Sequence, residues 1–349
     1  MSDEGRTRVL VVDDSPTVRS LVRRLLHRDP GLVVVGEAAD GARGVELVTA
    51  LQPDVVVMDI EMPVLDGLAA IEQIASRRPT PILVLTAREP QHPATRAFEA
   101  TRCGAVEVLP KPADPEGWRQ LEQALPRLVR ELAAAGRTPR DAAAGGEAPA
   151  PAIRPAARRL RFIAVAASTG GPEAVLRLLS ALPSPVPAAV LVVQHIASGF
   201  EENLAGWLAG KLSADVAVAR NGERAAPGRV RLAPPGAHLL LAPDETVRLD
   251  RDTPPRAGHR PSADELFRSC ARTFPTETAG VILTGMGADG AEGLAELRRH
   301  GGLALAQDGA SSVVFGMPRV AAAKGAVEVA LPPAQLGALL AQYLEGGGR

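Results

Sequence analysis

Short apolar runs alternate with amphipathic stretches along the chain, and this alternation restricts its fold more than any other feature. The runs are rich in Val, Leu and Ile, as strands buried on both faces are. After the first run, apolar residues recur at helical spacing, for example at Val18, Val22 and Leu25. Strands that alternate with helices form doubly wound parallel sheets. We predict the first five strands at residues 9–12, 33–37, 54–58, 81–85 and 105–109.

The length of 349 residues favours two domains, because single cores rarely grow beyond roughly 250 to 300 residues. With an apolar fraction of 46% but only 3% aromatic residues, Val, Leu, Ile and Ala must fill the interiors. We therefore expect an α/β protein with two doubly wound parallel-sheet domains, at residues 1–135 and 160–349. Residues 136–159 are rich in Ala, Pro and Gly and predict a flexible linker.

Charge and composition exclude several classes of protein. A formal net charge of −1 provides no overall basic field for nucleic acid or for an anionic membrane surface. The two cysteines, Cys103 and Cys270, have no metal-ligand spacing and indicate free thiols in a reducing compartment, the cytoplasm. The first apolar run is too short for a signal peptide, and prolines interrupt the uncharged stretch 178–200. We expect no membrane insertion.

Polar residues of the first module follow the ends of its predicted strands. Asp13 and Asp14 follow the first strand, and Asp59 follows the third. Adjacent carboxylates repel each other unless a cation lies between them, so this edge predicts a divalent cation site. Thr86 ends the fourth strand and Lys111 follows the fifth.

With these residues in place, the first module resembles a response-regulator receiver domain, which has a flavodoxin-like fold. The resemblance implies that Asp13, Asp14 and Asp59 hold Mg²⁺ and that Asp59 accepts a phosphoryl group from a histidine kinase. It also implies that Thr86 is the switch hydroxyl and that Lys111 contacts the phosphoryl group. A carboxylate nucleophile needs a cation and a lysine to offset the oxyanion charge. The alternative is an α/β domain with acidic loops and no chemistry, and the polar length of residues 87–93 departs from the family pattern.

In the second module, three strand ends carry the parts of an acyl-transfer site. Ser168 follows the strand 162–167, in a small-residue turn before a helix that we expect to begin at Pro172. His195 follows the strand 189–193, and Asp289 lies in the loop after a strand at 280–283. A hydroxyl, an imidazole and a carboxylate at one sheet edge can act as nucleophile, base and orienting group.

Two alternatives compete with this interpretation. Gly285, Gly287 and Gly290 satisfy the dinucleotide fingerprint between a strand and a helix, with Asp308 beyond the next strand, although Asp289 would repel a pyrophosphate.

His259 competes with His195 as the base. Ser262 and Glu265 have the spacing of a capping box, which places His259 in the loop before a helix and favours a rim or substrate-positioning role. The remaining histidines are expected to lie on helices or loops with no partner, as solvated or locally packed side chains: His27, His92, His238 and His300.

Six segments of the second module resemble the catalytic domain of the chemotaxis protein-glutamate methylesterases, a Rossmann-like α/β domain. They are residues 167–172, 193–195, 233–236, 259–262, 284–290 and 314–318. The resemblance implies Ser168 as nucleophile, His195 as base, Asp289 as its orienting group and the Met286 backbone N–H as an oxyanion donor, with Thr169 close by.

By the same resemblance, the substrates are glutamate γ-methyl esters on chemoreceptor cytoplasmic helices, which release methanol, and receptor glutamines, which are deamidated. The ester chemistry needs no cofactor. The expected protein is a phosphorylation-regulated hydrolase whose receiver covers the active site until Asp59 is phosphorylated. A signalling adaptor with a vestigial triad is the alternative from a different functional class.

Overall fold

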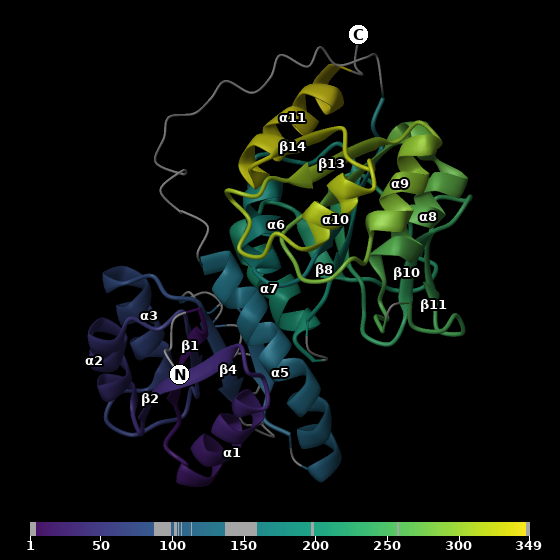
Figure 1. Cartoon of the computed structure of the whole chain (residues 1–349). Coiled ribbons are helices and arrows are strands. Elements are labelled where there is room, and N and C mark those ends of the chain that lie inside the picture. Colours follow the sequence, from purple (N-terminus) through teal and green to yellow (C-terminus); the bar gives the residue numbers. More distant parts are fainter. Residues whose placement is uncertain are drawn as a thin grey trace. The chain divides into compact units, whose positions relative to one another are not determined.

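The structure is a computed structural model in which residues 5–86, 99–100, 103, 105, 107–112, 114–136, 159–196, 199–256 and 258–346 are described (Figure 1). The chain divides into two compact units, residues 1–139 and 140–349. Most of the predicted linker, residues 137–158, lies outside the described residues. Each unit has its own sheet and its own hydrophobic core.

The first unit is built on a parallel sheet of five strands in the order β2-β1-β3-β4-β5. Its strands are β1 (Thr7–Val12), β2 (Leu32–Ala38), β3 (Val55–Met58), β4 (Ile82–Thr86) and β5 (Glu107–Pro110). Its helices include α1 (Pro16–His27), α2 (Gly41–Leu51), α3 (Gly67–Arg77) and α5 (Pro115–Gly136). Helix α1 contacts α5, and α2 contacts α3, so that helices cover both faces (Figure 1). The predicted doubly wound sheet is confirmed.

Local sequence signals explain where three of these helices begin. Ser15, Asp40 and Asp66 are the N-cap residues of α1, α2 and α3, and each side chain accepts a hydrogen bond from a backbone N–H of the first turn. Pro16 is the first residue of α1, where its missing N–H has no intrahelical partner. The caps place the loops that follow β1 and β3 at the carboxyl edge of the sheet.

The strands of this unit begin or end one or two residues away from the predicted bounds. Strand β5 begins at Glu107 because the N–H of Ala105 still donates to the carbonyl of Ala100 in the preceding turn, at 2.8 Å. Helix α5 begins at Pro115, which suits a first helical turn because its missing N–H has no intrahelical partner there.

The second unit contains a parallel sheet of seven strands in the order β14-β13-β12-β6-β7-β9-β8. They are β6 (Phe162–Ala167), β7 (Ala189–Gln194), β8 (Asp215–Val218), β9 (Arg229–Leu232), β12 (Thr278–Ile282), β13 (Leu303–Gln307) and β14 (Val329–Leu331). The predicted α/β class is confirmed here too. Strands β10 (His238–Leu241) and β11 (Val247–Asp250) form an antiparallel hairpin outside this sheet, which the sequence pattern did not predict.

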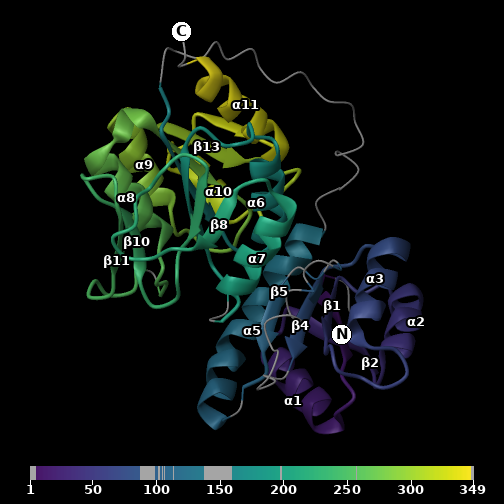
Figure 2. The same cartoon turned by 180° about the vertical axis from the view of Figure 1, so that it is seen from behind.

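Helices cover both faces of the seven-stranded sheet (Figures 1 and 2). They are α6 (Gly171–Ser180), α7 (Glu201–Lys211), α8 (Ala263–Thr273), α9 (Ala291–Arg299), α10 (Met317–Ala323) and α11 (Pro333–Gly346). Helix α6 contacts α7 and α11, whereas α9 contacts α8 and α10. Phe162 and Ala164 of β6 are buried in one cluster with Phe267 of α8 and Leu294 of α9. Among the described residues, no helix combines the length and apolar character that crossing a bilayer requires.

Strand β6 lies between β7 and β12, and this order decides which loops meet. The carboxyl ends of parallel strands share one edge of a sheet, which is where ligands bind in open α/β sheets. The segments that carry Ser168, His195 and Asp289 are therefore neighbours at that edge.

Candidate functional site

Ser168 lies in a turn that backbone contacts hold from two sides. Its N–H donates to the carbonyl of Thr284 at 3.0 Å, and its carbonyl accepts the N–H of Gly171 at 2.7 Å. Gly170 has a φ of 74°, and a Cβ there would lie 2.6 Å from Cβ of Val313, so that only glycine fits. Helix α6 begins at Gly171, one residue earlier than predicted.

His195 stands beside Ser168 across the sheet, because Ala167 and Gln194 are the preceding pair of β6 and β7. Nε2 of His195 lies 2.9 Å from Oδ2 of Asp289. The other ring nitrogen, Nδ1, is buried and makes no hydrogen bond to the described part of the chain. Within that part, no hydrogen bond is recorded between His195 and Ser168. Hydrogen bonds between a catalytic base and its nucleophile often have long distances in the absence of substrate and shorten when substrate binds.

The ring of His195 is stacked on a second imidazole. The His259 ring lies parallel to it, with the centroids 4.0 Å apart and an angle of 4° between the planes. His259 therefore contacts the face of the ring, while Asp289 contacts its edge. This arrangement leaves His195 as the histidine that bonds the carboxylate.

Gln194 is a site residue to which the sequence analysis assigned no role. Its side chain is buried, and Nε2 donates to the carbonyls of Ser168 at 2.7 Å and His195 at 2.9 Å. The amide thus ties the ends of β6 and β7 together. A Cβ at Gly171 would lie 2.1 Å from Oε1 of Gln194, which explains the second glycine of the turn. The sequence signal that could have indicated this role is the polar Gln194 at the end of an otherwise apolar strand.

Asp289 is buried and both of its carboxylate oxygens are occupied. Oδ1 accepts from Oγ of Ser262 at 2.6 Å and from the N–H of Asp264 at 3.2 Å. Oδ2 accepts from the N–H of Ala263 at 2.7 Å, beside the contact with His195. Burial alone would raise the pKa of Asp289, but hydrogen bonds and the charge of His195 outweigh it and lower the pKa to about 2.

The capping box predicted at Ser262 and Glu265 is wrong, although α8 does begin after Ser262. The Ser262 hydroxyl donates to Asp289 instead of accepting from its own helix. Glu265 forms ion pairs with Arg256 at 2.6 Å and Arg268 at 3.2 Å. A carboxylate from a distant loop takes the free N–H groups of the helix, so the local cap is not needed.

Three of the remaining histidines have polar contacts in the described residues. His238 is fully buried: Nδ1 accepts the Ser262 N–H at 3.2 Å, and Nε2 lies 3.3 Å from the carbonyl of Pro254. His238 lies on strand β10 and not on a helix or loop as expected, and it is a packed core histidine whose ring holds the Ser262 backbone. His27 and His300 bond carbonyls of their own helices, and His92 lies outside the described residues.

The loop after β12 is held against the Ser168 turn. The buried hydroxyl of Thr284 donates to the carbonyl of Thr169 at 2.9 Å, and the Thr284 N–H donates to Oε1 of Gln307 at 2.8 Å. A Cβ at Gly285 would lie 2.7 Å from Cβ of Ser168, so Met286 follows a residue in direct contact with that serine. This proximity is what an oxyanion donor at Met286 requires.

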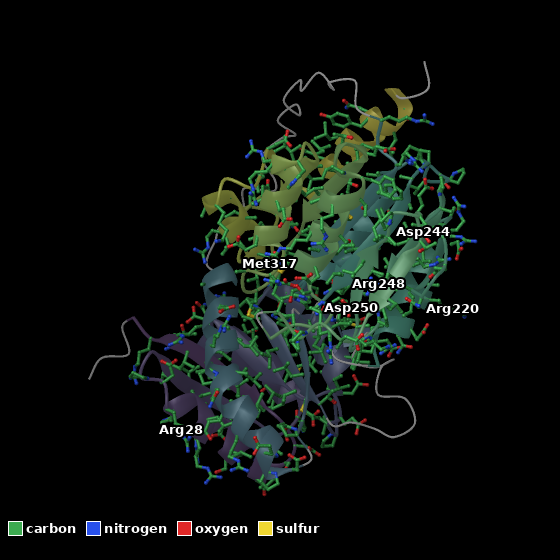
Figure 3. The ribbon with its side chains drawn as sticks, turned by 90° about the vertical axis from the view of Figure 1, so that its right-hand side faces the viewer. Arg28, Arg220, Asp244, Arg248, Asp250 and Met317 are labelled. Atoms are coloured by element: carbon green, nitrogen blue, oxygen red, sulfur yellow. The ribbon has the colours of Figure 1, made fainter. Side chains whose placement is uncertain are left out.

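Helix α10 also packs against this loop. Met317, labelled in Figure 3, is fully buried, and its N–H donates to the carbonyl of Gly285 at 2.9 Å. A Cβ at Gly285 would also lie 2.4 Å from Sδ of Met317. Glycine at this position lets the loop lie between the serine turn and α10.

The glycine fingerprint has a packing explanation. A Cβ at Gly290, whose φ is 89°, would lie 3.0 Å from Cβ of Ala263, and Gly290 thus allows α9 to approach α8. In a dinucleotide site the helix N-terminus binds a pyrophosphate. At the N-terminus of α9 a protein carboxylate takes that place, because Oδ1 of Asp264 accepts the Gly293 N–H at 2.7 Å. These contacts disfavour the dinucleotide alternative.

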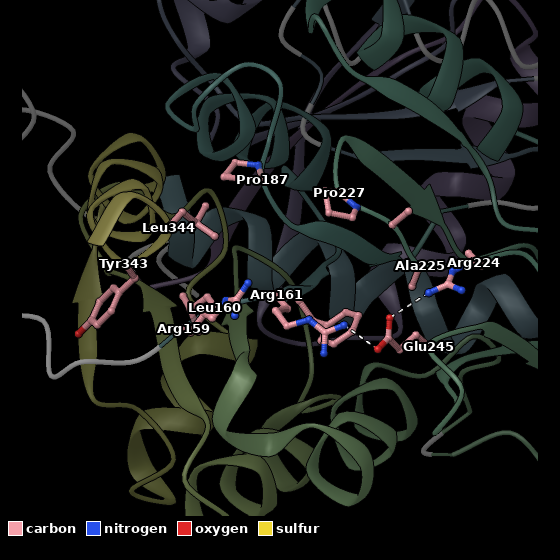
Figure 4. A pocket seen from close by; sticks show the side chains of 12 residues that line it. Arg159, Leu160, Arg161, Pro187, Arg224, Ala225, Pro227, Glu245, Tyr343 and Leu344 are labelled. Carbon is pink, nitrogen blue, oxygen red and sulfur yellow. Dashed lines mark hydrogen bonds and ion pairs between the residues drawn. The ribbon is translucent and has the colours of Figure 1, made fainter. Parts of the chain in front are cut away.

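Two pockets lie at opposite edges of the sheet. A pocket of about 170 Å³ adjoins the stacked imidazoles, with Gln194, Glu201 and Arg260 in its wall. A larger pocket, of about 300 Å³, lies where β6 begins (Figure 4). Its Arg161 and Arg224 are both paired with Glu245, at 2.6 and 3.3 Å, so these charges already have partners within the unit. The smaller pocket is the one beside the candidate chemistry.

In the first unit, the predicted phosphorylation residues meet around a lysine. Nζ of Lys111 lies 2.7 Å from Oδ2 of Asp13 and 2.5 Å from Oδ2 of Asp59. Burial raises the pKa of Asp13, while the hydrogen bond and charge of Lys111 lower it in part. The Thr86 side chain is buried, and its carbonyl accepts the Lys111 N–H at 2.6 Å. The departing segment 87–93 lies outside the described residues.

The acidic cluster suits a hard divalent cation. Asp13, Asp14 and Asp59 each offer an oxygen, and these atoms lie within 4.8 Å of one another. Mg²⁺ prefers oxygen ligands and is bound through carboxylates together with substrate phosphates. The exposed Asp14 and the buried Asp13 and Asp59 therefore fit the predicted Mg²⁺ site.

Comparisons with known proteins agree with this arrangement. A family model described as CheB methylesterase matches residues 163–340, and the response regulator receiver domain model matches residues 9–123. One relative, protein-glutamate methylesterase/protein-glutamine glutaminase 3 of Anaeromyxobacter dehalogenans, is 44% identical over 97% of this chain and 99% of its own length. A similarly named protein of Geobacter metallireducens is 41% identical over 93% of this chain and 95% of its own length.

A solved structure supports the same assignment for the second unit. The crystal structure of the Thermotoga maritima CheB methylesterase catalytic domain is 33% identical, with a TM-score of 0.51, and the match covers 52% of this chain and 98% of that one. Together with the near full-length relatives, this shows that the chain belongs to the CheB methylesterase family and carries a response regulator receiver domain.

Proposed function

We propose that this protein is a phosphorylation-regulated hydrolase that removes methyl groups from glutamate γ-methyl esters of chemoreceptors and deamidates receptor glutamines. The observation that carries the proposal is the 2.9 Å contact between His195 and Asp289 at a sheet edge where Ser168 is the neighbouring strand-end residue. The names of the near full-length relatives support the substrate class. Because the substrates are cytoplasmic receptor helices, the enzyme acts in the cytoplasm.

The chemistry follows from the positions of the three side chains. Nδ1 of His195 takes the proton of Ser168 as Oγ attacks the ester carbonyl, and Asp289 stabilises the imidazolium that forms. The Met286 N–H, with Thr169 close by, holds the oxyanion. Methanol, or ammonia from glutamine, then leaves with a proton from His195, and water resolves the acyl-enzyme.

The pocket beside the imidazoles is the place for the substrate side chain. Nδ1 of His195 and Nε of Arg260 are buried and have no hydrogen-bond partner in the described residues. Nδ1 can therefore take the Ser168 proton, and Nε of Arg260 is available to a bound group. His259 covers the face of the His195 ring, which suits the rim role expected for it. A glutamyl side chain on a receptor helix is long enough to enter while the helix stays outside.

A direct assay tests this function. A peptide that carries a glutamate γ-methyl ester should release methanol when it is incubated with the protein, and a glutamine peptide should release ammonia more slowly. An adaptor with a vestigial triad would release neither product from either peptide above the rate in buffer alone. The activity should persist after metal chelation, because no metal takes part in the ester chemistry.

We further propose that Asp59 is the phosphoryl acceptor of the receiver and that a histidine kinase is the donor. Asp13, Asp14 and Asp59 would hold Mg²⁺, which offsets negative charge on the transferred group when it is bound. Lys111, within 2.7 Å of two of these carboxylates, is placed to contact the phosphoryl oxygens. Thr86 adjoins Lys111 through the backbone and serves as the switch hydroxyl.

Asp59→Asn should abolish phosphorylation of the chain, because the amide removes the nucleophilic oxygen. The measurement is incorporation of labelled phosphoryl groups from a small-molecule donor in the presence of Mg²⁺. Asp40→Asn, which changes only the half-buried N-cap of α2, is the matched control and should be labelled as the wild type is. Labelling of the Asp59→Asn variant at the wild-type level would place the acceptor elsewhere.

Deletion of residues 1–135 should raise basal hydrolysis, because the unphosphorylated receiver is proposed to cover the active site. Phosphorylation adds a charge of about −1.5 to −2, and a nearly complete switch needs a differential of about 5.5 kcal/mol. The isolated catalytic domain of the Thermotoga maritima relative was crystallised, so the truncated chain is a reasonable test object. Equal or lower kcat/KM in the truncated protein contradicts the covering model.

A further inference from the structure

The N-terminus of α8 and the side chain of Ser262 together surround the carboxylate of Asp289. Oδ1 and Oδ2 of Asp289 accept four hydrogen bonds, from Ser262 Oγ, the N–H groups of Ala263 and Asp264, and His195 Nε2. A carboxylate has about four lone-pair sites, so this one has none left for another donor. Rotation of the carboxylate would break several of these bonds at once.

The direction of the Ser262 bond separates this arrangement from ordinary helix capping. An N-cap serine accepts a hydrogen bond from the first turn of its own helix, whereas Ser262 makes no such bond. Its hydroxyl donates to Asp289 instead, with 2.6 Å between Oγ and Oδ1, and its backbone N–H donates to Nδ1 of His238. Ser262 and His238 are fully buried and Asp289 is buried, so water does not replace either hydrogen bond of Ser262.

A second aspartate makes the same kind of contact in the opposite direction. Asp264, in the first turn of α8, accepts the N–H of Gly293 in the first turn of α9, while Asp289, just before α9, caps α8. The two helices can approach because a Cβ at Gly293 would lie 2.5 Å from the Asp264 carbonyl oxygen. These reciprocal caps connect the loop of Asp289 to α8 over 25 to 29 residues of sequence.

We propose that Ser262 is a positioning residue for the ester chemistry, which it supports by holding the Asp289 carboxylate in the orientation that bonds His195 Nε2. This inference rests on the proposed function. Ser262 does not touch the substrate. It acts through Asp289, and the backbone N–H groups of α8 supply the remaining donors and a favourable helix dipole.

The loss of this hydroxyl has a predictable direction. Without the Ser262 proton, Oδ1 keeps more negative charge, so Asp289 attracts the imidazolium of His195 more strongly. The acid limb of the rate profile should then move to higher pH. In the described part of the chain, the other titratable or charged groups around this pair are Asp264, His238 and His259, with Glu201 and Arg260 across the adjoining pocket. Ser262→Ala changes none of them covalently.

The test compares full-length Ser262→Ala with Ser269→Ala. Ser269 is also a buried serine of α8, but its hydroxyl bonds the carbonyl of Leu266 and the N–H of Leu241, far from the triad. We expect Ser262→Ala to lower kcat by about 10-fold to 100-fold, the scale of one charge-assisted hydrogen bond, with little change in KM and with the acid limb moved up. Ser269→Ala should lose stability and keep the wild-type acid limb.

A spectroscopic readout separates this inference from the proposed function. In proton NMR spectra, the His195 Nε2–H that bonds Asp289 should give a downfield signal that moves or broadens in Ser262→Ala and persists in Ser269→Ala. This signal can be measured without hydrolysis. If the wild type releases no methanol, that result overturns the proposed function, and the signal still tests the role of Ser262. Unchanged kcat, acid limb and downfield signal in Ser262→Ala would overturn the positioning role, as would a loss of kcat without either of the other changes.

If Ser262→Ala does not fold, Ser262→Cys carries the test. Its thiol has nearly the same shape and is a weaker donor. The acid limb should then move in the same direction by a smaller amount. A wild-type acid limb and a wild-type downfield signal in Ser262→Cys would contradict the inference.

Discussion

Ser168→Ala is expected to reduce methanol release by about 10⁶-fold, because the variant lacks the oxygen that forms the acyl-enzyme. The turn itself should be unaffected, since backbone groups of Thr284 and Gly171 and the amide of Gln194 hold it. The measurement is kcat on a glutamate γ-methyl ester peptide, together with a search for a covalent adduct by mass spectrometry after reaction with a serine-directed fluorophosphonate.

Ser180→Ala is the matched control for this variant. Ser180 is an exposed serine at the end of α6, the helix that begins behind Ser168. It should keep the wild-type rate and should form the same single adduct as the wild type. Near wild-type hydrolysis by Ser168→Ala would assign the nucleophile to another residue.

Asp289→Asn is expected to reduce kcat by about 10⁴-fold, because an amide does not stabilise the imidazolium and favours the wrong tautomer of His195. The substitution should also destabilise the second unit. An amide NH₂ would face one of the donors that now bond the carboxylate, and an unsatisfied buried group costs about 1 to 3 kcal/mol. Rate and thermal unfolding are measured on the same preparation.

The loss of stability should depend on pH in a defined direction. The pKa of Asp289 is lowered from 3.8 to about 2 in the folded protein, so the ionised carboxylate stabilises the fold above pH 4. That contribution fades as the pH falls through the window between about 4 and 2. The difference in unfolding free energy between wild type and Asp289→Asn should therefore be largest near neutral pH and shrink in acid.

Asp308→Asn serves as the control for Asp289→Asn. Asp308 lies in the loop after β13, and its carboxylate accepts the N–H and the hydroxyl of Ser311 without contacting the triad. It should retain full activity with at most a local loss of stability. If Asp289→Asn hydrolyses the ester at the Asp308→Asn rate, His195 does not depend on Asp289.

Much of the candidate site followed from one physical rule. Ser168, His195 and Asp289 are predicted from strand ends alone, because parallel strands bring their carboxyl ends to a single edge. The same rule brings Asp13, Asp59 and the lysine of the receiver together. The rule leaves these ends on one side of the sheet, and the strand order then decides that they are neighbours.

Local rules were less reliable where a distant group competed for the same atoms. Ser262 has the sequence neighbours of a capping box, but Asp289, which is 27 residues away in sequence, takes the hydroxyl and the free N–H groups of α8. His238 lacks a partner in its own segment and finds one in the Ser262 N–H, 24 residues away.

The sequence by itself determined the two α/β units and the residues at their strand ends, because hydrophobic period and turn residues act over a few neighbouring positions. The tertiary structure alone decided that β6 lies between β7 and β12, that Gln194 ties two strand ends together, and that Asp289 caps α8. These contacts depend on helix and strand packing across the fold. Burying these polar groups costs free energy that the hydrogen bonds between them offset, and no local pattern in the chain encodes which groups meet.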